Sequence, residues 1–166
     1  MTVAAALLAE LEHEAETTRR VLERIPQAHL AWKPHPKSYS LGQLALHVAS
    51  TPGNVAELAM QDNAQPPAFV QPEAATTAEL GAALTDTVAK AKRLLDGVDD
   101  ARMAKTWRLT SGGRELMAMP RAAFLRAIML NHWYHHRGQL LVYLRLLNLP
   151  VPSVYGPTAD ENPFAG

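Results

Sequence analysis

The chain of 166 residues contains no cysteine. This absence excludes disulfide bonds, zinc sites with cysteine ligands and a cysteine nucleophile, so any sulfur chemistry requires a thiol from another molecule. The chain also lacks an excess of either charge, because 16 Lys and Arg residues balance 16 Asp and Glu residues. We therefore expect no nucleic-acid partner and no attraction to an acidic lipid surface.

Long apolar runs are missing as well. The N-terminal stretch MTVAAALLAELEHEAE is apolar only briefly and has no basic region ahead of its apolar residues, unlike a signal peptide. No apolar run reaches the length that a membrane-spanning helix needs. The sequence thus favours a soluble, cytoplasmic protein without a membrane partner, and its length fits one domain over residues 1–166.

What the sequence does contain is helical periodicity. Apolar residues recur every three or four positions in four stretches, which is typical of amphipathic helices. The patterns S-x-x-Q from Ser40 and T-x-x-E from Thr76 resemble capping boxes and mark two helix starts. Pro120 suits the first turn of the last helix. The four predicted helices cover residues 3–25, 40–60, 76–98 and 120–148.

The region between the third and fourth predicted helices has a different pattern. The stretch WRLTSGGREL alternates in character around Gly112 and Gly113, so we expect a small β-hairpin near residues 106–116. The other segments between helices are long and irregular, and prolines interrupt them. The predicted fold class is all-α: a four-helix bundle with long connections and this one hairpin.

The last predicted helix carries three histidines in the stretch LNHWYHHRGQL, residues 130–140. Positions i and i+4 lie close together on one helix face, so His132 and His136 can share a metal ion. His135 lies about 100° away from its neighbour, on the flank. His47 adjoins the inward-facing residues of the second predicted helix, so we expect it to point into the bundle as a third ligand.

Three neutral imidazoles leave a divalent cation with open coordination positions, which is typical of catalytic rather than structural zinc sites. We expect zinc or nickel, with copper, manganese and iron as alternatives, because imidazole ligands alone do not fix the metal. Trp133 stands where zinc proteases of the H-E-x-x-H kind carry a glutamate base, so that class is excluded. The competing interpretation of His47 is a hydrogen-bonded core histidine without a metal.

The surroundings of the histidine pair indicate what the site binds. The stretch 120–148 contains four arginines and no Asp or Glu. The sequence therefore predicts a positive surround that favours anionic ligands such as a thiolate, a carboxylate or an enolate. Glu14 falls on the inward seam of the first predicted helix. It is either a catalytic base or hydrogen-bond partner near the metal, or an edge residue that reaches solvent.

Four pieces of the sequence form an ordered set that spans most of the chain: Trp32-Lys33-Pro34, SLGQLALHVA at 40–49, NHWYHHRGQL at 131–140 and PSVYGPTADE at 152–161. Together they resemble the DinB/YfiT-like family of metalloenzymes. The resemblance implies a four-helix bundle, commonly dimeric, with one metal held by His47, His132 and His136. It also implies a small-molecule substrate, because characterised members include thiol S-transferases that use bacillithiol or mycothiol and a mycothiol-dependent maleylpyruvate isomerase.

Competing functions remain open at this point. The chain is either a metal-dependent transferase or hydrolase, with a low-molecular-weight thiol as cosubstrate, or a non-catalytic protein that binds a metal or small ligand. A third interpretation is a polar core that only sets helix register. In an enzyme, Arg137 and Gln139 would orient the substrate, and Trp32 and Tyr155 would either wall the pocket or pack. The first and last predicted helices carry apolar residues beyond one stripe, and this excess favours a homodimer. Examples are Leu8, Leu22, Leu125, Leu140 and Leu141.

Overall fold

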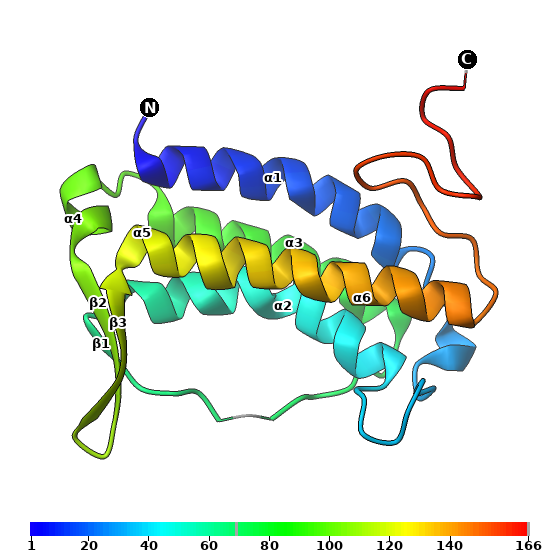
Figure 1. Ribbon diagram of the computed structural model, residues 1–166, viewed down its shortest axis with the longest axis horizontal. Helices are drawn as coiled ribbons and strands as arrows, with labels where there is room; N and C mark the ends of the chain where they lie inside the picture. The colour runs from blue at the N-terminus through cyan, green and yellow to red at the C-terminus, as the bar shows by residue number, and fades with distance from the viewer. Residues whose placement is uncertain (69, 166) are drawn as a thin grey trace.

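The computed structural model describes residues 1–68 and 70–165 as a mostly helical chain with a small three-stranded sheet (Figure 1). The helices are α1 (Val3–Leu22), the short 3-10 helix η1 (Gln27–His29), α2 (Leu41–Met60), α3 (Thr77–Leu95), α4 (Asp100–Ala104), α5 (Arg121–Phe124), the π-helical η2 (Leu125–Asn131) and α6 (His132–Leu146). The strands are β1 (Asn63–Ala64), β2 (Thr106–Ser111) and β3 (Arg114–Pro120).

The long helices run side by side along the long axis of the molecule, and the sheet lies at one end (Figure 1). α2 packs against α3 and also against η2 and α6, while α1 packs against α3. Their apolar faces meet in one core, in which Leu11, Leu44, Leu84 and Leu140 are at most 1% exposed. Within the described residues, no helix combines the length and the apolarity needed to cross a bilayer.

The two predicted capping boxes differ in outcome. At the start of α2, the Ser40 hydroxyl accepts from the Gln43 backbone N–H at 3.1 Å, and the Gln43 side chain accepts from the Ser40 N–H at 2.9 Å, which confirms the first box. At Thr76 the predicted helix start is confirmed, because Thr76 is the N-cap residue of α3, but the predicted capping box is wrong, because the Thr76 hydroxyl caps no backbone N–H of α3. The first N–H of α3 donates instead to Gln27 Oε1 at 2.8 Å, so a distant segment supplies the cap.

The hairpin prediction is confirmed, and it is part of a larger sheet. β2 and β3 pair antiparallel, and Gly112 and Gly113 join them with φ angles of 57° and 78°. Two-residue hairpin loops require positive φ at such positions, which glycine adopts without strain. β1 pairs in parallel with β2, so the all-α prediction missed a three-stranded sheet. Two residues of β1 are too few to show a period in the sequence.

Arg121 ties the sheet end of α2 to the segment that carries the histidine pair. Its guanidinium is fully buried and donates to the Ala59 carbonyl at 2.6 Å, the Arg102 carbonyl at 2.7 Å and the Asp62 carboxylate at 2.8 Å. The Ala59 carbonyl lies in the last turn of α2, where carbonyls have no N–H partner within their own helix. Arg121 therefore closes the end of α2 and fixes where α5 begins.

Candidate metal centre

Three histidines from two helices meet between α2 and α6. His47 from α2 and His132 and His136 from α6 each offer a ligand atom, and these atoms all lie within 4.8 Å of one another. His132 Nε2 and His136 Nε2 are 2.9 Å apart. Zinc binds imidazole nitrogens at roughly 2.0–2.1 Å, so tetrahedral ligands lie about 3.3 Å from one another. The three imidazoles are therefore close to the spacing that one metal ion requires.

The π-helical segment η2 ends directly before His132. A π-helix has a wider turn than an α-helix, is rare, and occurs frequently beside functional sites. The wider turn rotates the residues that follow relative to an unbroken α-helix from Arg121. The face that α6 turns toward α2 is therefore set by η2 as well as by the spacing of the histidines.

Pro52 and Trp133 hold the two ligand-bearing helices together. Proline lacks the backbone N–H that would bind the carbonyl four residues earlier, which in α2 is that of Val48. This carbonyl accepts instead from the indole Nε1–H of Trp133 at 2.7 Å. Because Val48 follows His47 and Trp133 follows His132, this one bond sets the two histidines opposite each other.

The environment of the three imidazoles favours their neutral form. Burial, followed by the charges of His136 and His132, lowers the pKa of His47 from 6.5 to about 4. Burial is also the largest cause that lowers the pKa of His132. Burial lowers the pKa of His136 as well, although the hydrogen bond to Gln139 acts in the opposite direction. A neutral imidazole has a free lone pair and can ligate a metal. The site therefore needs no proton release to bind a cation at neutral pH.

Two ring nitrogens of this group are buried and have no hydrogen-bond partner among residues 1–68 and 70–165: His47 Nε2 and His132 Nδ1. A buried polar atom without a partner costs free energy, and native structures rarely leave one unsatisfied. A cation bound through His47 Nε2 would satisfy that lone pair, whereas His132 Nδ1 lies on the other side of its ring from Nε2 and would not reach the same ion. The donor set, the spacing and the unpaired His47 Nε2 thus fit a divalent metal with three histidine ligands.

Gln139 orients His136 from the turn that follows it. Gln139 Oε1 lies 2.8 Å from His136 Nδ1, and Gln139 Nε2 lies 3.1 Å from His135 Nε2. The amide oxygen can only accept, so this contact assigns the proton of neutral His136 to Nδ1 and leaves Nε2 free for a metal. From the sequence we expected Gln139 to contact a substrate. This contact was missed from the sequence, although the i, i+3 spacing of His136 and Gln139 could have indicated it.

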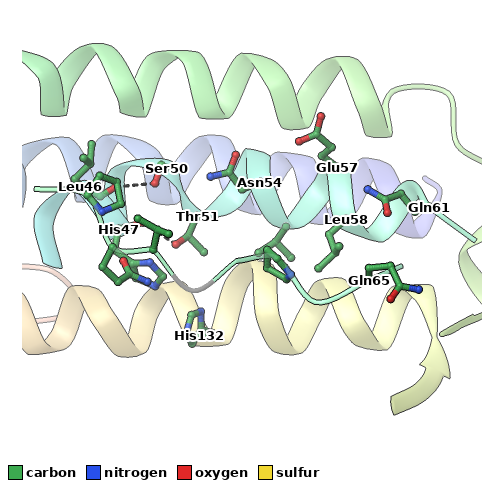
Figure 2. Close-up of a pocket in the computed structure, with 15 residues that line it drawn as sticks. Leu46, His47, Ser50, Thr51, Asn54, Glu57, Leu58, Gln61, Gln65 and His132 are labelled. Carbon is green, nitrogen blue, oxygen red and sulfur yellow. Dashed lines mark hydrogen bonds between the residues drawn. The ribbon is translucent and has the colours of Figure 1, made fainter. Parts of the chain in front are cut away.

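A cavity of about 560 Å³ opens beside the histidines (Figure 2). His47 and His132 line it near one end, and Gln61 and Gln65 lie at the other. One wall is the face of α2 that carries His47, and another part of the wall comes from the segment that follows α2, with Val70 among its residues. The cavity therefore lies against two of the three imidazoles.

Glu14 is buried in α1, as the helical seam predicts, but its carboxylate has partners other than an imidazole. It pairs with the Arg137 guanidinium at 2.6 Å and accepts from the Tyr155 hydroxyl at 3.1 Å. Arg137 also donates to Thr18 Oγ1 at 3.1 Å, and its guanidinium lies over the ring of Tyr155. The expected hydrogen bond from a ligand histidine to Glu14 is not formed among the described residues. A catalytic role for Glu14 stays a prediction.

The predicted positive surround is wrong. Each arginine of the segment from Arg121 to Arg145 pairs with a carboxylate from another part of the chain. The pairs are Arg121–Asp62 at 2.8 Å, Arg126–Glu10 at 2.6 Å, Arg137–Glu14 at 2.6 Å and Arg145–Asp160 at 2.5 Å. Tertiary contacts supply the acids that the local sequence lacks, so the histidine-bearing segment is balanced in charge.

The remaining candidate residues lie away from the cavity at His47. Trp32 packs edge-on against Tyr143, with ring centroids 5.6 Å apart. Arg137 and Tyr155 line a separate, smaller cavity of about 260 Å³. His135 is exposed on the flank of α6, as the helical geometry predicts. Trp32 therefore packs, whereas Tyr155 is 71% exposed and contacts Glu14 and Arg137 through its hydroxyl, and neither residue walls the metal centre.

Comparisons with known proteins agree with this architecture. The sequence pattern of the DinB family matches residues 1–163. The uncharacterized protein YjoA of Bacillus subtilis is 27% identical over 129 residues, which cover 77% of this chain and 80% of YjoA.

Solved structures extend the likeness to three dimensions. A DinB-like protein from Bacillus cereus superposes with a TM-score of 0.69 at 23% identity, over 90% of this chain and 95% of that one. The structure of YjoA from Bacillus subtilis gives a TM-score of 0.67 at 19% identity, over 90% of this chain and 97% of that one. At such identities these structures show a shared fold.

Proposed function

Because this chain belongs to the DinB family and brings three histidines to one point, we propose that it is a metal-dependent enzyme acting on a small molecule. His47, His132 and His136 are its metal ligands. The observation that carries the proposal is the meeting of three imidazoles, held neutral by burial, of which His47 and His132 line a cavity of about 560 Å³. Imidazole ligands suit zinc and nickel best here, and iron or manganese less well.

The proposed chemistry depends on the coordination positions that three histidine ligands leave open on a divalent ion. A divalent ion bound there would supply a Lewis acid that activates a thiol or a water as nucleophile. The chain's own residues position the centre: Gln139 fixes the tautomer of His136, and the Val48–Trp133 bond fixes the distance between helices. Because the chain has no cysteine, a thiol nucleophile must arrive as a cosubstrate. The proposal therefore includes a thiol-dependent S-transferase that uses a low-molecular-weight thiol of the bacillithiol or mycothiol kind.

The proposal extends to the assembly of the protein. We assign the long segments α1, α2, α3 and α5–α6 as the four members of a bundle in a cytoplasmic homodimer. Leu22, Leu125 and Leu140, which the sequence offered for a partner surface, are buried in the core. Val142 and Leu146, one turn apart on α6, are 57% and 56% exposed and offer an apolar surface to a second copy instead. Light scattering at micromolar concentration measures the assembly, and a monomeric mass would contradict the dimer.

Turnover separates an enzyme from a metal or ligand sensor. The test uses untagged protein loaded with zinc or nickel and a panel of low-molecular-weight thiols with an electrophilic acceptor, followed by loss of free thiol. We expect turnover in the loaded protein and in His135→Ala, and none in the metal-free protein or in His136→Ala. If the loaded protein binds thiols without turnover under every condition, the enzyme proposal fails and the non-catalytic alternative replaces it.

A further inference from the structure

The cavity beside the metal centre is long. Its lining residues extend along α2 from His47 through Asn54 to Gln61, the residue that follows the helix. Fourteen residues of α-helix rise about 21 Å. His47 and Gln61 lie toward opposite ends of the pocket (Figure 2). A ligand that fills this space is extended, with its reactive head at the histidines and its tail toward Gln61.

The far part of the cavity offers no cation to a ligand. Among its described lining residues there is no lysine or arginine, and Glu57 is the one charged residue. The Glu57 carboxylate is already paired with Lys90 Nζ at 2.7 Å. Lys90 also donates to Asn54 Oδ1 at 3.2 Å, so its ammonium group is held by two oxygens of the wall. The arginines of α6 are likewise paired with acids, as described above.

The polar groups of the wall suit uncharged partners. The hydroxyls of Ser50 and Thr51 donate to carbonyls of their own helix, at 2.8 and 2.6 Å, so toward a ligand their oxygens can accept. Asn54 uses its oxygen for Lys90, which leaves its amide N–H groups to donate. Leu58 and Val55 add apolar surface between these groups. Amide or hydroxyl groups on an aliphatic chain match this mixture.

We propose that the cavity selects a ligand with an uncharged tail, bearing amide or hydroxyl groups, over the same ligand with an anionic tail. A tail carboxylate or phosphate would lose water on entering and meet Glu57 without a free cation. The inference rests on the proposed function for the head of the ligand, which the metal centre holds. It concerns the tail, which the wall of α2 holds, and it therefore favours a thiol of the mycothiol kind, whose tail is uncharged, over one of the bacillithiol kind, whose tail carries two carboxylates.

Three thiols with the same head test the inference. N-acetylcysteamine has almost no tail, pantetheine has an uncharged tail with amides and hydroxyls, and 4′-phosphopantetheine adds one phosphate at the far end. Extended pantetheine is about 15 Å long, as long as four to five extended residues, and reaches most of the way along the cavity. The cobalt-loaded protein is titrated with each thiol, and the sulfur-to-cobalt charge-transfer band and the dissociation constant are recorded.

We expect all three thiols to give the band, with pantetheine binding at least tenfold more tightly than 4′-phosphopantetheine. Equal or tighter binding of 4′-phosphopantetheine, with the band present for N-acetylcysteamine, would overturn the tail inference and leave the metal centre intact. Absence of the band for every thiol, including N-acetylcysteamine, would overturn the proposed function, and the tail inference with it. The two failures are therefore distinct.

A charge placed in the far wall provides the matched variant. Gln61→Arg adds a cation at the end of the cavity, and Ala82→Arg adds the same charge at an exposed position of α3 outside the lining. We expect Gln61→Arg to tighten 4′-phosphopantetheine binding at least fivefold and leave N-acetylcysteamine unchanged, while Ala82→Arg changes neither. An equal effect of both variants would show that net charge, not the wall, decides binding, and would overturn the inference.

Discussion

Gln139 provides a test of how the metal centre is positioned. Its side-chain oxygen lies 2.8 Å from His136 Nδ1, and Gln139 itself is not one of the three proposed metal ligands. Gln139→Leu keeps the approximate volume and removes the acceptor. Neutral His136 can then carry its proton on either ring nitrogen, and the tautomer with Nε2 protonated cannot bind through Nε2.

The size of the effect follows from the contact that is lost. One neutral hydrogen bond contributes about 0.5–1.5 kcal/mol net, and partners of metal-bound histidines typically change affinity by about 10–100-fold. Gln139 is half-buried, so water can replace part of the bond, and the lower end of this range applies. We expect metal affinity to fall about tenfold. Gln139→Glu, whose carboxylate is a stronger acceptor, should bind the metal at least as tightly as the natural residue.

Competition with a chromophoric zinc chelator measures these affinities. The matched control is His135→Ala, which removes the second partner of Gln139 at 3.1 Å and leaves the bond to His136 in place. Thermal unfolding of the metal-free variants checks that the fold is unchanged. The reasoning is refuted if Gln139→Leu binds zinc as tightly as the natural protein while His136→Ala loses it.

Two further predictions concern the packing and the protonation of the site. Trp133→Phe removes the donor to the Val48 carbonyl and leaves that oxygen buried, so we expect the free energy of unfolding to fall by about 1–3 kcal/mol in urea denaturation; an unchanged midpoint would contradict the role of this bond. The metal-free protein should lose stability as the pH falls from 6.5 toward about 4, because the pKa of His47 is lower in the folded than in the unfolded chain and the unfolded chain therefore takes up more protons. His47→Gln should flatten this dependence in thermal unfolding across that range, and an equally steep profile would show that other groups cause it.

The sequence predicted the parts of the molecule that depend on local spacing. The period of apolar residues located the long helices, and the i, i+4 spacing indicated that His132 and His136 share a face. Gly112 and Gly113 indicated the hairpin because their neighbours alternate around them and glycine accepts positive φ. Such features are encoded within a few residues of one another.

What the sequence did not predict depends on contacts between distant segments. Nothing in the stretch 125–131 distinguishes the π-helix from an α-helix, because the packing of its wider turn decides between them. The sequence placed Glu14 correctly at an inward position. It did not indicate the partner of Glu14, because Arg137 lies 123 residues further along the chain. The positive surround was wrong for the same reason: the acids that balance those arginines come from other elements.

Metal content is the measurement that tests the central claim most directly. Untagged natural protein, His136→Ala and His135→Ala are purified in parallel, exposed to zinc or nickel, dialysed and analysed by elemental mass spectrometry. We predict about one divalent ion per chain for the natural protein and for His135→Ala, and nearly none for His136→Ala, because two imidazoles hold a cation far more weakly than three. Full occupancy in His136→Ala, or an absence of metal in the natural protein, would contradict the three-histidine centre.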